Sequence, residues 1–102
     1  MSNELSFNER CYELLKLIPE GKVTTYKEMA AALDTKAWRA VGSAMAKNEH
    51  LFIIPCHRVV RSDGAIGGYA LGADKKTELL ISEGVNIANG RVQNLSDVIH
   101  RF

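Results

Sequence analysis

The sequence contains few cysteines and no closely spaced cysteine pair, which excludes several classes of protein. Cys11 and Cys56 are the two cysteines among 102 residues, and no Cys-x-x-Cys occurs. A disulfide-rich secreted scaffold would need more cysteines than this. The candidate zinc ligands match no finger, ribbon or deaminase spacing; they are Cys11, Cys56, His50, His57 and His100. We therefore expect no metal and no cofactor.

Long apolar runs and a basic excess are also missing. The apolar runs are far too short to span a bilayer, and the polar, acidic first four residues do not have the order of a signal peptide. We expect no membrane association and an intracellular location, in the cytoplasm of a prokaryote or the nucleus of a eukaryote. Because 13 Lys and Arg face 12 Asp and Glu, binding to nucleic acid would require a local basic cluster.

The composition is that of an ordinary globular domain. Apolar residues make up 46% of the chain and charged residues 25%. A length of 102 residues fits one domain with a modest core. We expect a single domain over residues 1–102 and a monomer.

Capping signals divide the first half of the chain into three short helices. Ser6 and Glu9 form a capping-box pattern before an apolar periodicity that extends to Ile18. Thr25 and Glu28 repeat this pattern and predict a second helix to about Leu33. After a break at residues 34–35, residues 36–47 are predicted to form a third helix. Two short helices across a tight break indicate a helix-turn-helix.

The second half predicts less regular structure. Residues 51–54 form a short β-like run that Pro55 stops, and residues 59–60 are predicted to be extended. Asp74 is expected to cap a fourth helix that runs to about Glu83, with Gly84 at its end. The tail from residue 85 predicts one short strand or loop. The expected fold is mainly α with a little β, a winged helix-turn-helix-like domain of four to five short helices.

The most unusual segment places a thiol beside an imidazole and a guanidinium, at Cys56, His57 and Arg58. A thiolate is the reactive form of cysteine, and a nearby base or positive charge favours it. His57 is a candidate base, acting directly or through water. Neighbours on an extended backbone point to opposite sides, which favours a bridging water. The alternative is a buried, inert Cys56 with Arg58 as a surface charge.

The third helix is rich in small residues around Arg39, including Ala40 and Gly42. Small side chains on an exposed face let a helix approach a groove closely, and Arg39 could then reach phosphate or replace a displaced base. The alternative is that the small residues pack inward and Arg39 is solvated. A positive face near this helix would be formed by Lys22, Lys27, Lys36, Arg39 and Lys47.

Two tyrosines are candidates for contact with a base. Tyr26 at a helix start and Tyr69 in a glycine-rich loop could stack on a base or hydrogen-bond to it, although half-buried core positions are the alternative. Trp38 is expected to pack rather than to stack on a base.

Taken together, these residues resemble the O6-alkylguanine-DNA alkyltransferase family over its C-terminal DNA-binding and active-site domain, from about Phe7 to Gly84. The Pro-Cys-His-Arg-Val motif at residues 55–59 is highly specific to that family. Further matches occur in the same order along the chain: Arg39, Ala40, Val41, Gly42, Ala44, Met45 and Asn48 before the motif, and Gly64, Ala65, Ile66, Gly67, Tyr69, Lys76, Glu83 and Gly84 after it.

The resemblance implies catalytic roles for four residues. Cys56 would be the acceptor thiol, and His57 the base that acts through water. Glu83 would orient and polarise His57, and Asn48 would brace the active-site turn.

The resemblance also implies a DNA-binding surface that includes Ala40, Gly42 and Arg58. Arg39 would fill the gap that the extruded base leaves, from a helix in the minor groove. Tyr26 would help to rotate the nucleotide out of the duplex, and Val59 and Tyr69 would line the alkylguanine pocket.

The implied activity is that of a methylated-DNA–protein-cysteine methyltransferase that repairs alkylated guanine in duplex DNA and acts once. Two features depart from the family. Longer members carry an N-terminal domain, which we expect this protein to lack, and Ala70 stands where a serine usually follows the pocket tyrosine. Losing that serine's hydrogen bond, about 0.5–1.5 kcal/mol, would slow transfer rather than abolish it.

Two other functions compete with the repair transferase. One is a non-catalytic, alkyltransferase-like protein that binds the lesion and signals to other repair factors. Such proteins are also single short domains, but they usually carry tryptophan where this chain has Cys56. The other is a DNA-binding regulator that uses the helix-turn-helix on undamaged sequence.

Overall fold

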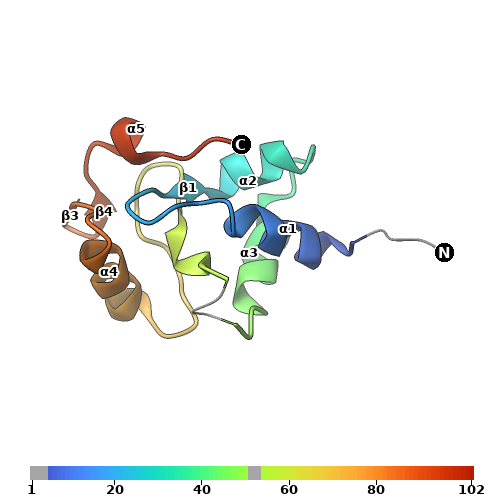
Figure 1. Ribbon diagram of the computed structural model, residues 1–102, viewed down its shortest axis with the longest axis horizontal. Helices are drawn as coiled ribbons and strands as arrows, with labels where there is room; N and C mark the ends of the chain where they lie inside the picture. Colours follow the sequence, from blue (N-terminus) through green and yellow to red (C-terminus); the bar gives the residue numbers. More distant parts are fainter. Residues whose placement is uncertain (1–4, 51–53) are drawn as a thin grey trace.

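The computed structural model describes residues 5–50 and 54–102, and within them the chain is mainly helical (Figure 1). The prediction of a mainly α fold with a little β is confirmed. The helices are α1 (Phe7–Leu15), α2 (Tyr26–Ala32), α3 (Trp38–Ala46), the 3-10 helix η1 (Cys56–Arg58), α4 (Ala73–Ser82) and α5 (Leu95–Val98). The strands are β1 (Thr24–Thr25), β2 (Val59–Val60), β3 (Ile87–Ala88) and β4 (Arg91–Val92).

The first two helices begin where the capping residues predict. At α1, the Ser6 hydroxyl accepts from the Glu9 N–H and the Glu9 carboxylate accepts from the Ser6 N–H, each at 3.1 Å. At α2, the Thr25 hydroxyl accepts from the Glu28 N–H at 3.1 Å. The helix α1 ends at Leu15, short of the predicted Ile18, because the Ile18 N–H bonds back only three residues, to the Leu15 carbonyl.

Other element boundaries differ from the prediction. The third helix begins at Trp38 rather than at residue 36. Asp74 lies in the first turn of α4 and does not cap it, because Gly72, with φ +94°, precedes the helix. The tail forms two paired strands and the helix α5, more than the one strand or loop expected. Of the predicted β-like run, residues 51–53 lie outside the described residues.

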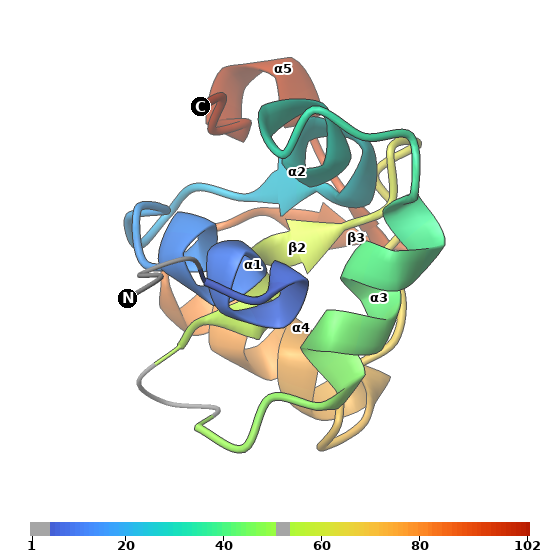
Figure 2. The ribbon, with the colours of Figure 1, turned by 90° about the vertical axis from the view of Figure 1, so that its right-hand side faces the viewer.

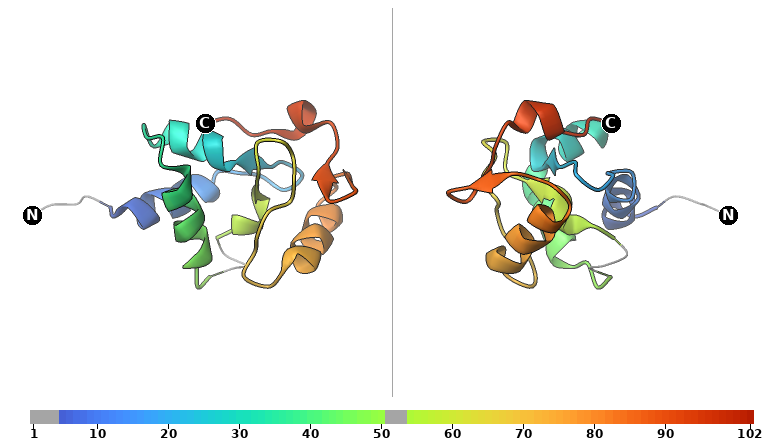
Figure 3. Two further views of the ribbon diagram at one scale, coloured as in Figure 1. Left: turned by 180° about the vertical axis from the view of Figure 1, so that it is seen from behind. Right: turned by 60° about the vertical axis from the view of Figure 1, so that its left-hand side comes forward.

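Short strands connect segments that are distant in sequence. Thr24 pairs with Val59 and Thr25 with Val60 in parallel register, so the end of η1 is held next to the start of α2. Figure 2 shows β1 and β2 at the centre, with α1 and α3 beside them. In the views of Figures 1 and 3 the C-terminus ends beside α2.

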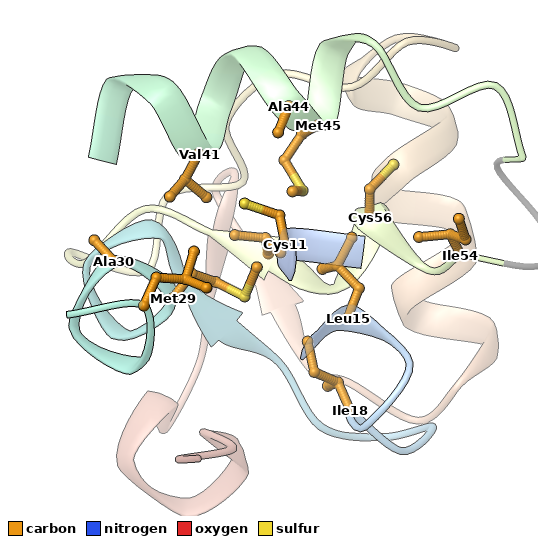
Figure 4. Packing of buried hydrophobic residues seen from close by; sticks show 12 residues of the cluster. Cys11, Leu15, Ile18, Met29, Ala30, Val41, Ala44, Met45, Ile54 and Cys56 are labelled. Atoms are coloured by element: carbon orange, nitrogen blue, oxygen red, sulfur yellow. The ribbon is translucent and has the colours of Figure 1, made fainter. Parts of the chain in front are cut away.

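Two groups of buried residues hold these elements together. The first joins α1, α2 and α3 to η1, and its labelled members are shown in Figure 4. The second lies between α4 and the C-terminal strands; its buried members are Val23, Val60, Ile66, Leu80, Val85 and Val92. Because Cys56 belongs to the first group and follows directly on Pro55, the core itself fixes the position of the thiol.

Candidate active site

Cys56 begins η1 and borders a cavity although it is only 4% exposed. In Figure 4 its side chain points toward the end of α3 that carries Met45, whereas Cys11 lies in the middle of the cluster. The cavity is formed by α2, α3 and the loop before α4. Its lining residues are Tyr26, Gly42, Met45, Ala46, Cys56, Gly68, Tyr69 and Ala70.

The cavity is large enough for a flat ring system. Its volume is about 240 Å³. For comparison, an engineered apolar cavity of about 150 Å³ binds benzene. The lining is mostly apolar, with two tyrosines and one thiol, as in sites that bind aromatic ligands.

Burial makes Cys56 a thiol rather than a thiolate in the resting protein. Desolvation raises the pKa of Cys56 above its ordinary value, although the Asn48 side chain and the positive charge of Lys76 act in the opposite direction. The neighbouring charge therefore favours the thiolate as expected, but burial outweighs it in the resting state. A base must take the proton when the sulfur reacts.

His57, Arg58 and Glu83 form one connected cluster beside the thiol. His57 Nε2 lies 2.9 Å from Glu83 Oε2. Arg58 donates to both carboxylate oxygens, from Nε at 2.9 Å and from Nη2 at 2.7 Å, and its Nη1 donates to the Ile18 carbonyl at 2.7 Å. Arg58 is thus a structural partner of Glu83 in this cluster, and the alternative of a solvated surface charge is wrong.

The cluster leaves His57 ready to accept a proton. Burial lowers the pKa of His57 despite the neighbouring carboxylate, so the imidazole is neutral at pH 7. The hydrogen-bond network assigns its single N–H to Nε2, which donates to Glu83. Within the described residues, the buried His57 Nδ1 has no partner, and this nitrogen is then the acceptor.

Asn48 fixes the turn that precedes the thiol. It is buried at the end of α3, its side-chain amide donates to the Ile54 carbonyl at 3.0 Å, and its oxygen accepts from the His50 N–H at 2.9 Å. Both bonds hold the chain on either side of residues 51–53. The position fits the bracing role that the sequence resemblance implies.

The other predicted site residues lie at different distances from the cavity. Tyr26, Tyr69 and Gly42 line it. Val59 does not, because its side chain is fully buried in the core and only its backbone carbonyl is engaged nearby. Arg39 is exposed on the first turn of α3, away from the cavity lining.

The neighbours of Arg39 on α3 show different burial. Val41 and Ala44 are fully buried and Ala40 is partly buried, so the inward packing given as the alternative holds for Val41 and Ala44. Trp38, which was expected to pack, is 53% exposed.

Gly42 offers a way to fill the cavity without disturbing the fold. A Cβ at this helical position meets nothing within 4 Å. Gly42→Ala should stabilise the protein by about 0.5–1 kcal/mol, because alanine loses less entropy in a helix. Gly42→Leu should leave the melting temperature near that of Gly42→Ala but lower, at least about tenfold, the rate at which Cys56 reacts with a flat aromatic thiol reagent that enters the cavity. An unchanged rate in Gly42→Leu would show that the cavity does not admit the reactant.

Lys76 has no predicted role, but it is completely buried beneath the site. Its Nζ donates to the carbonyls of Val59 at 2.6 Å and Gly68 at 3.1 Å. It therefore connects the strand after η1 to the loop that lines the cavity. The sequence signal was weak: Lys76 lies four residues before the apolar Leu80 on the same face of α4, but a lysine is usually exposed.

The pKa of Lys76 provides a test of this burial. Desolvation lowers the pKa of Lys76 from 10.5 to about 8. Between pH 8 and pH 10.5, Lys76 holds a proton in the unfolded chain but not in the folded chain. The free energy of unfolding should therefore rise with pH over this range. Compared with Lys76→Met, wild type should gain at most about 1.4 kcal/mol per pH unit over this window. Denaturant unfolding at pH 7, 8, 9 and 10 measures this difference, and parallel curves would contradict it.

The described residues also bear on metals and membranes. Cys11 and Cys56 are both free. Over residues 5–50 and 54–102, no three potential ligands of the His, Cys, Asp or Glu type gather in one place. In the same part of the chain, no helix has the length and apolar character needed to cross a bilayer.

Comparison with known proteins agrees with this site. Residues 6–85 match the family described as 6-O-methylguanine DNA methyltransferase, DNA binding domain. The methylated-DNA–protein-cysteine methyltransferase of Sulfolobus acidocaldarius is 48% identical over 82 residues, which cover 80% of this chain and 52% of that protein. The bifunctional methyltransferase/endonuclease of Picrophilus torridus is 50% identical over 82 residues, 79% of this chain and 28% of that protein. This chain thus spans about half or less of these curated relatives.

Solved structures show the same fold. The O6-methylguanine-DNA methyltransferase of Pyrococcus kodakaraensis superposes with a TM-score of 0.73 at 46% identity, and the match covers 79% of this chain and 47% of that protein's chain. Atl1 of S. pombe, in complex with damaged DNA containing O6-carboxymethylguanine, gives a TM-score of 0.82 at 31% identity and covers 94% and 95% of the two chains. The family match and the cysteine-lined cavity lead to one conclusion: this chain belongs to the 6-O-methylguanine DNA methyltransferase family and contains its DNA-binding domain.

Proposed function

We propose that this protein repairs duplex DNA by moving an alkyl group, methyl in the simplest case, from O6 of guanine to the sulfur of Cys56. The observation that carries the proposal is the position of Cys56 at the cavity wall. The next residue in the chain, His57, pairs with Glu83. A buried cysteine with no such cavity would have no access to a base. Cys11, fully buried in the same core group and absent from the cavity lining, is the internal comparison.

The chemistry is a single displacement. His57 Nδ1 takes the thiol proton, directly or through one water, and the sulfur attacks the alkyl carbon. The carbon–oxygen bond to guanine breaks, its electron pair stays on the base, and a proton returns to the guanine. The products are an unmodified guanine and a thioether at Cys56. Among the residues that the structure describes near Cys56, none can cleave a thioether, so each molecule is expected to act once.

Access to the base requires extrusion from the duplex, because the exocyclic oxygen lies inside the stack. Extrusion costs a few kcal/mol, and less for a weakly paired damaged base. Tyr26 begins α2 and lines the cavity, which supports the proposal that it contacts the extruded nucleotide. Arg39, exposed on α3, would enter the space that the base leaves, with α3 in the minor groove.

Stoichiometry tests this proposal. Duplex DNA with a radiolabelled methyl on O6 of one guanine should transfer label to the protein until one methyl is bound per molecule, and no further. The recovered DNA should contain ordinary guanine at that position. Label that stays on the DNA at excess protein, or transfer that exceeds one per molecule, would contradict single-use transfer.

A second function is supported by the similarity to Atl1, which extends over 94% of this chain. A non-catalytic protein would bind alkylguanine in the same cavity and signal to other repair factors. In that case the duplex with the lesion would bind tightly with no transfer, and Cys56→Ser would not change the affinity.

A further inference from the structure

A second groove shares one lining residue with the cavity. Its lining residues are Tyr26, Lys27, Trp38, Arg61 and Ser62, and its volume is about 370 Å³. Tyr26 lines both spaces. An occupant of the groove and an occupant of the cavity would therefore both contact Tyr26.

The charge of the groove is positive. Lys27 and Arg61 are exposed, and among the described residues neither forms an ion pair. Asp63 is a carboxylate on which Arg61 acts. The pKa of Asp63 is lowered mainly by the hydrogen bond from the Ala65 N–H, and also by the charges of Arg91 and Arg61. Asp63 is itself engaged by Ala65 at 3.0 Å and by Arg91 at 3.9 Å. Two cations thus face solvent over the groove and can receive an anion.

Trp38 is the unusual member of this lining. It is the sole tryptophan of the chain, and half of its surface is open to solvent at the first residue of α3. An exposed aromatic face beside cations suits one strand of nucleic acid, because the ring can pack against a sugar or a base and every phosphate has a charge.

We propose that this groove holds the nucleotide that adjoins the extruded guanine on the same strand. Its phosphate lies between Lys27 and Arg61, and Trp38 packs against its deoxyribose, while its base stays stacked in the duplex. The inference rests on the proposed function, because continuity of the strand past Tyr26 is what brings that nucleotide to the groove. Trp38 then determines how firmly the damaged strand is held, next to the Arg39 side chain on the same helix turn.

Trp38 is also the reporter for the test. Titration with duplex DNA should quench its fluorescence, since no other tryptophan contributes. By anisotropy of a labelled duplex, Trp38→Ala should bind about tenfold more weakly than wild type, as expected for a lost aromatic contact with the strand. Trp38→Phe keeps an aromatic ring and should lose less affinity. Thermal unfolding should be nearly unchanged, because the side chain is half exposed.

Charge is tested separately. The double variant Lys27→Gln and Arg61→Gln should lower the slope of log affinity against log salt by about one, for one phosphate no longer neutralised. Lys16→Gln is the matched control, since Lys16 is exposed on the surface near the end of α1 and pairs with Glu13 at 3.0 Å. Its slope should equal that of wild type.

A free alkylguanine base separates this inference from the proposed function. The base enters the cavity without a neighbouring nucleotide, so Trp38→Ala should react with it at the wild-type rate while reacting more slowly with duplex. If wild type transfers no alkyl group from either substrate but is still quenched by duplex, transfer is refuted and the groove as a DNA site stands. Unquenched fluorescence with wild-type affinity in Trp38→Ala would overturn the groove assignment.

Discussion

Cys56→Ala is expected to abolish alkyl transfer while leaving binding to duplex DNA within about twofold of wild type, a difference below about 0.5 kcal/mol. The sulfur is the only atom of Cys56 that can accept the alkyl carbon, so no residual pathway remains. DNA binding should persist because the cations and the exposed face of α3 do not depend on the thiol. Transfer is measured with labelled methylguanine duplex, and binding with an undamaged duplex.

Cys11→Ala is the matched control. Cys11 is completely buried, desolvation raises the pKa of its thiol to about 11, and it does not line the cavity. The substitution should destabilise the protein through the small space it leaves in the core, yet transfer per folded molecule should equal wild type. If transfer survives in Cys56→Ala and disappears in Cys11→Ala, the acceptor is Cys11 and the proposal for Cys56 is wrong.

Glu83→Gln is expected to slow transfer by about 10²–10⁴-fold, the usual range for losing a positioned proton acceptor. The amide can keep the shape of the carboxylate but does not hold the Nε2 proton of His57 with a charge. His57 Nδ1 would then be a weaker base toward the Cys56 thiol. The same substitution should cost about 3 kcal/mol of stability, because it leaves the largely buried Arg58 without its anionic partner.

Arg58→Met separates these two effects of Glu83. It removes the two bonds from the guanidinium and the one to the Ile18 carbonyl, but it leaves the 2.9 Å bond between His57 and Glu83. Stability should fall by an amount similar to that in Glu83→Gln, whereas transfer per folded molecule should fall much less. Equal losses of transfer in both variants would mean that Glu83 only supports the fold.

The dependence on pH follows from the same pair. Burial lowers the pKa of His57 below its ordinary value of 6.5, so the neutral acceptor form persists at pH 7 and the transfer rate should decline only below pH 6.5. The unfolded chain binds a proton in this range that folded His57 does not, so unfolding free energy should also fall as pH drops. Burial alone would raise the pKa of Glu83, but Arg58 and His57 together lower it, which keeps the carboxylate ionised there.

Local signals in the sequence predicted the elements that position the site. Ser6 and Thr25 start their helices because their hydroxyls satisfy backbone N–H groups within three residues, and such short-range bonds can be read directly from the sequence. The sequence of the Pro55–Val59 segment likewise indicated a thiol beside a base. That Cys56, Tyr26 and Tyr69 share a cavity was implied by family resemblance and not by any local pattern, whereas Gly42 was expected only on the DNA-binding surface.

Long-range packing decided what the sequence could not indicate. Whether Arg58 is solvated or tied to Glu83 depends on how α4 packs against η1, 25 residues away in the chain. The burial of Lys76 and the exposure of Trp38 both oppose the usual preference of their residue types. For Lys76, a group distant in sequence, the Val59 carbonyl, sets the outcome.

The central claim is that the Cys56 sulfur receives the alkyl group, and peptide mass spectrometry tests it most directly. The protein is incubated with duplex that contains one O6-methylguanine, digested, and the peptides with Cys11 and Cys56 are compared. The account predicts that the Cys56 peptide alone gains one methyl group in place of one hydrogen, in proportion to the duplex added. An unmodified Cys56 peptide at saturating duplex, or a methyl on the Cys11 peptide, would contradict it.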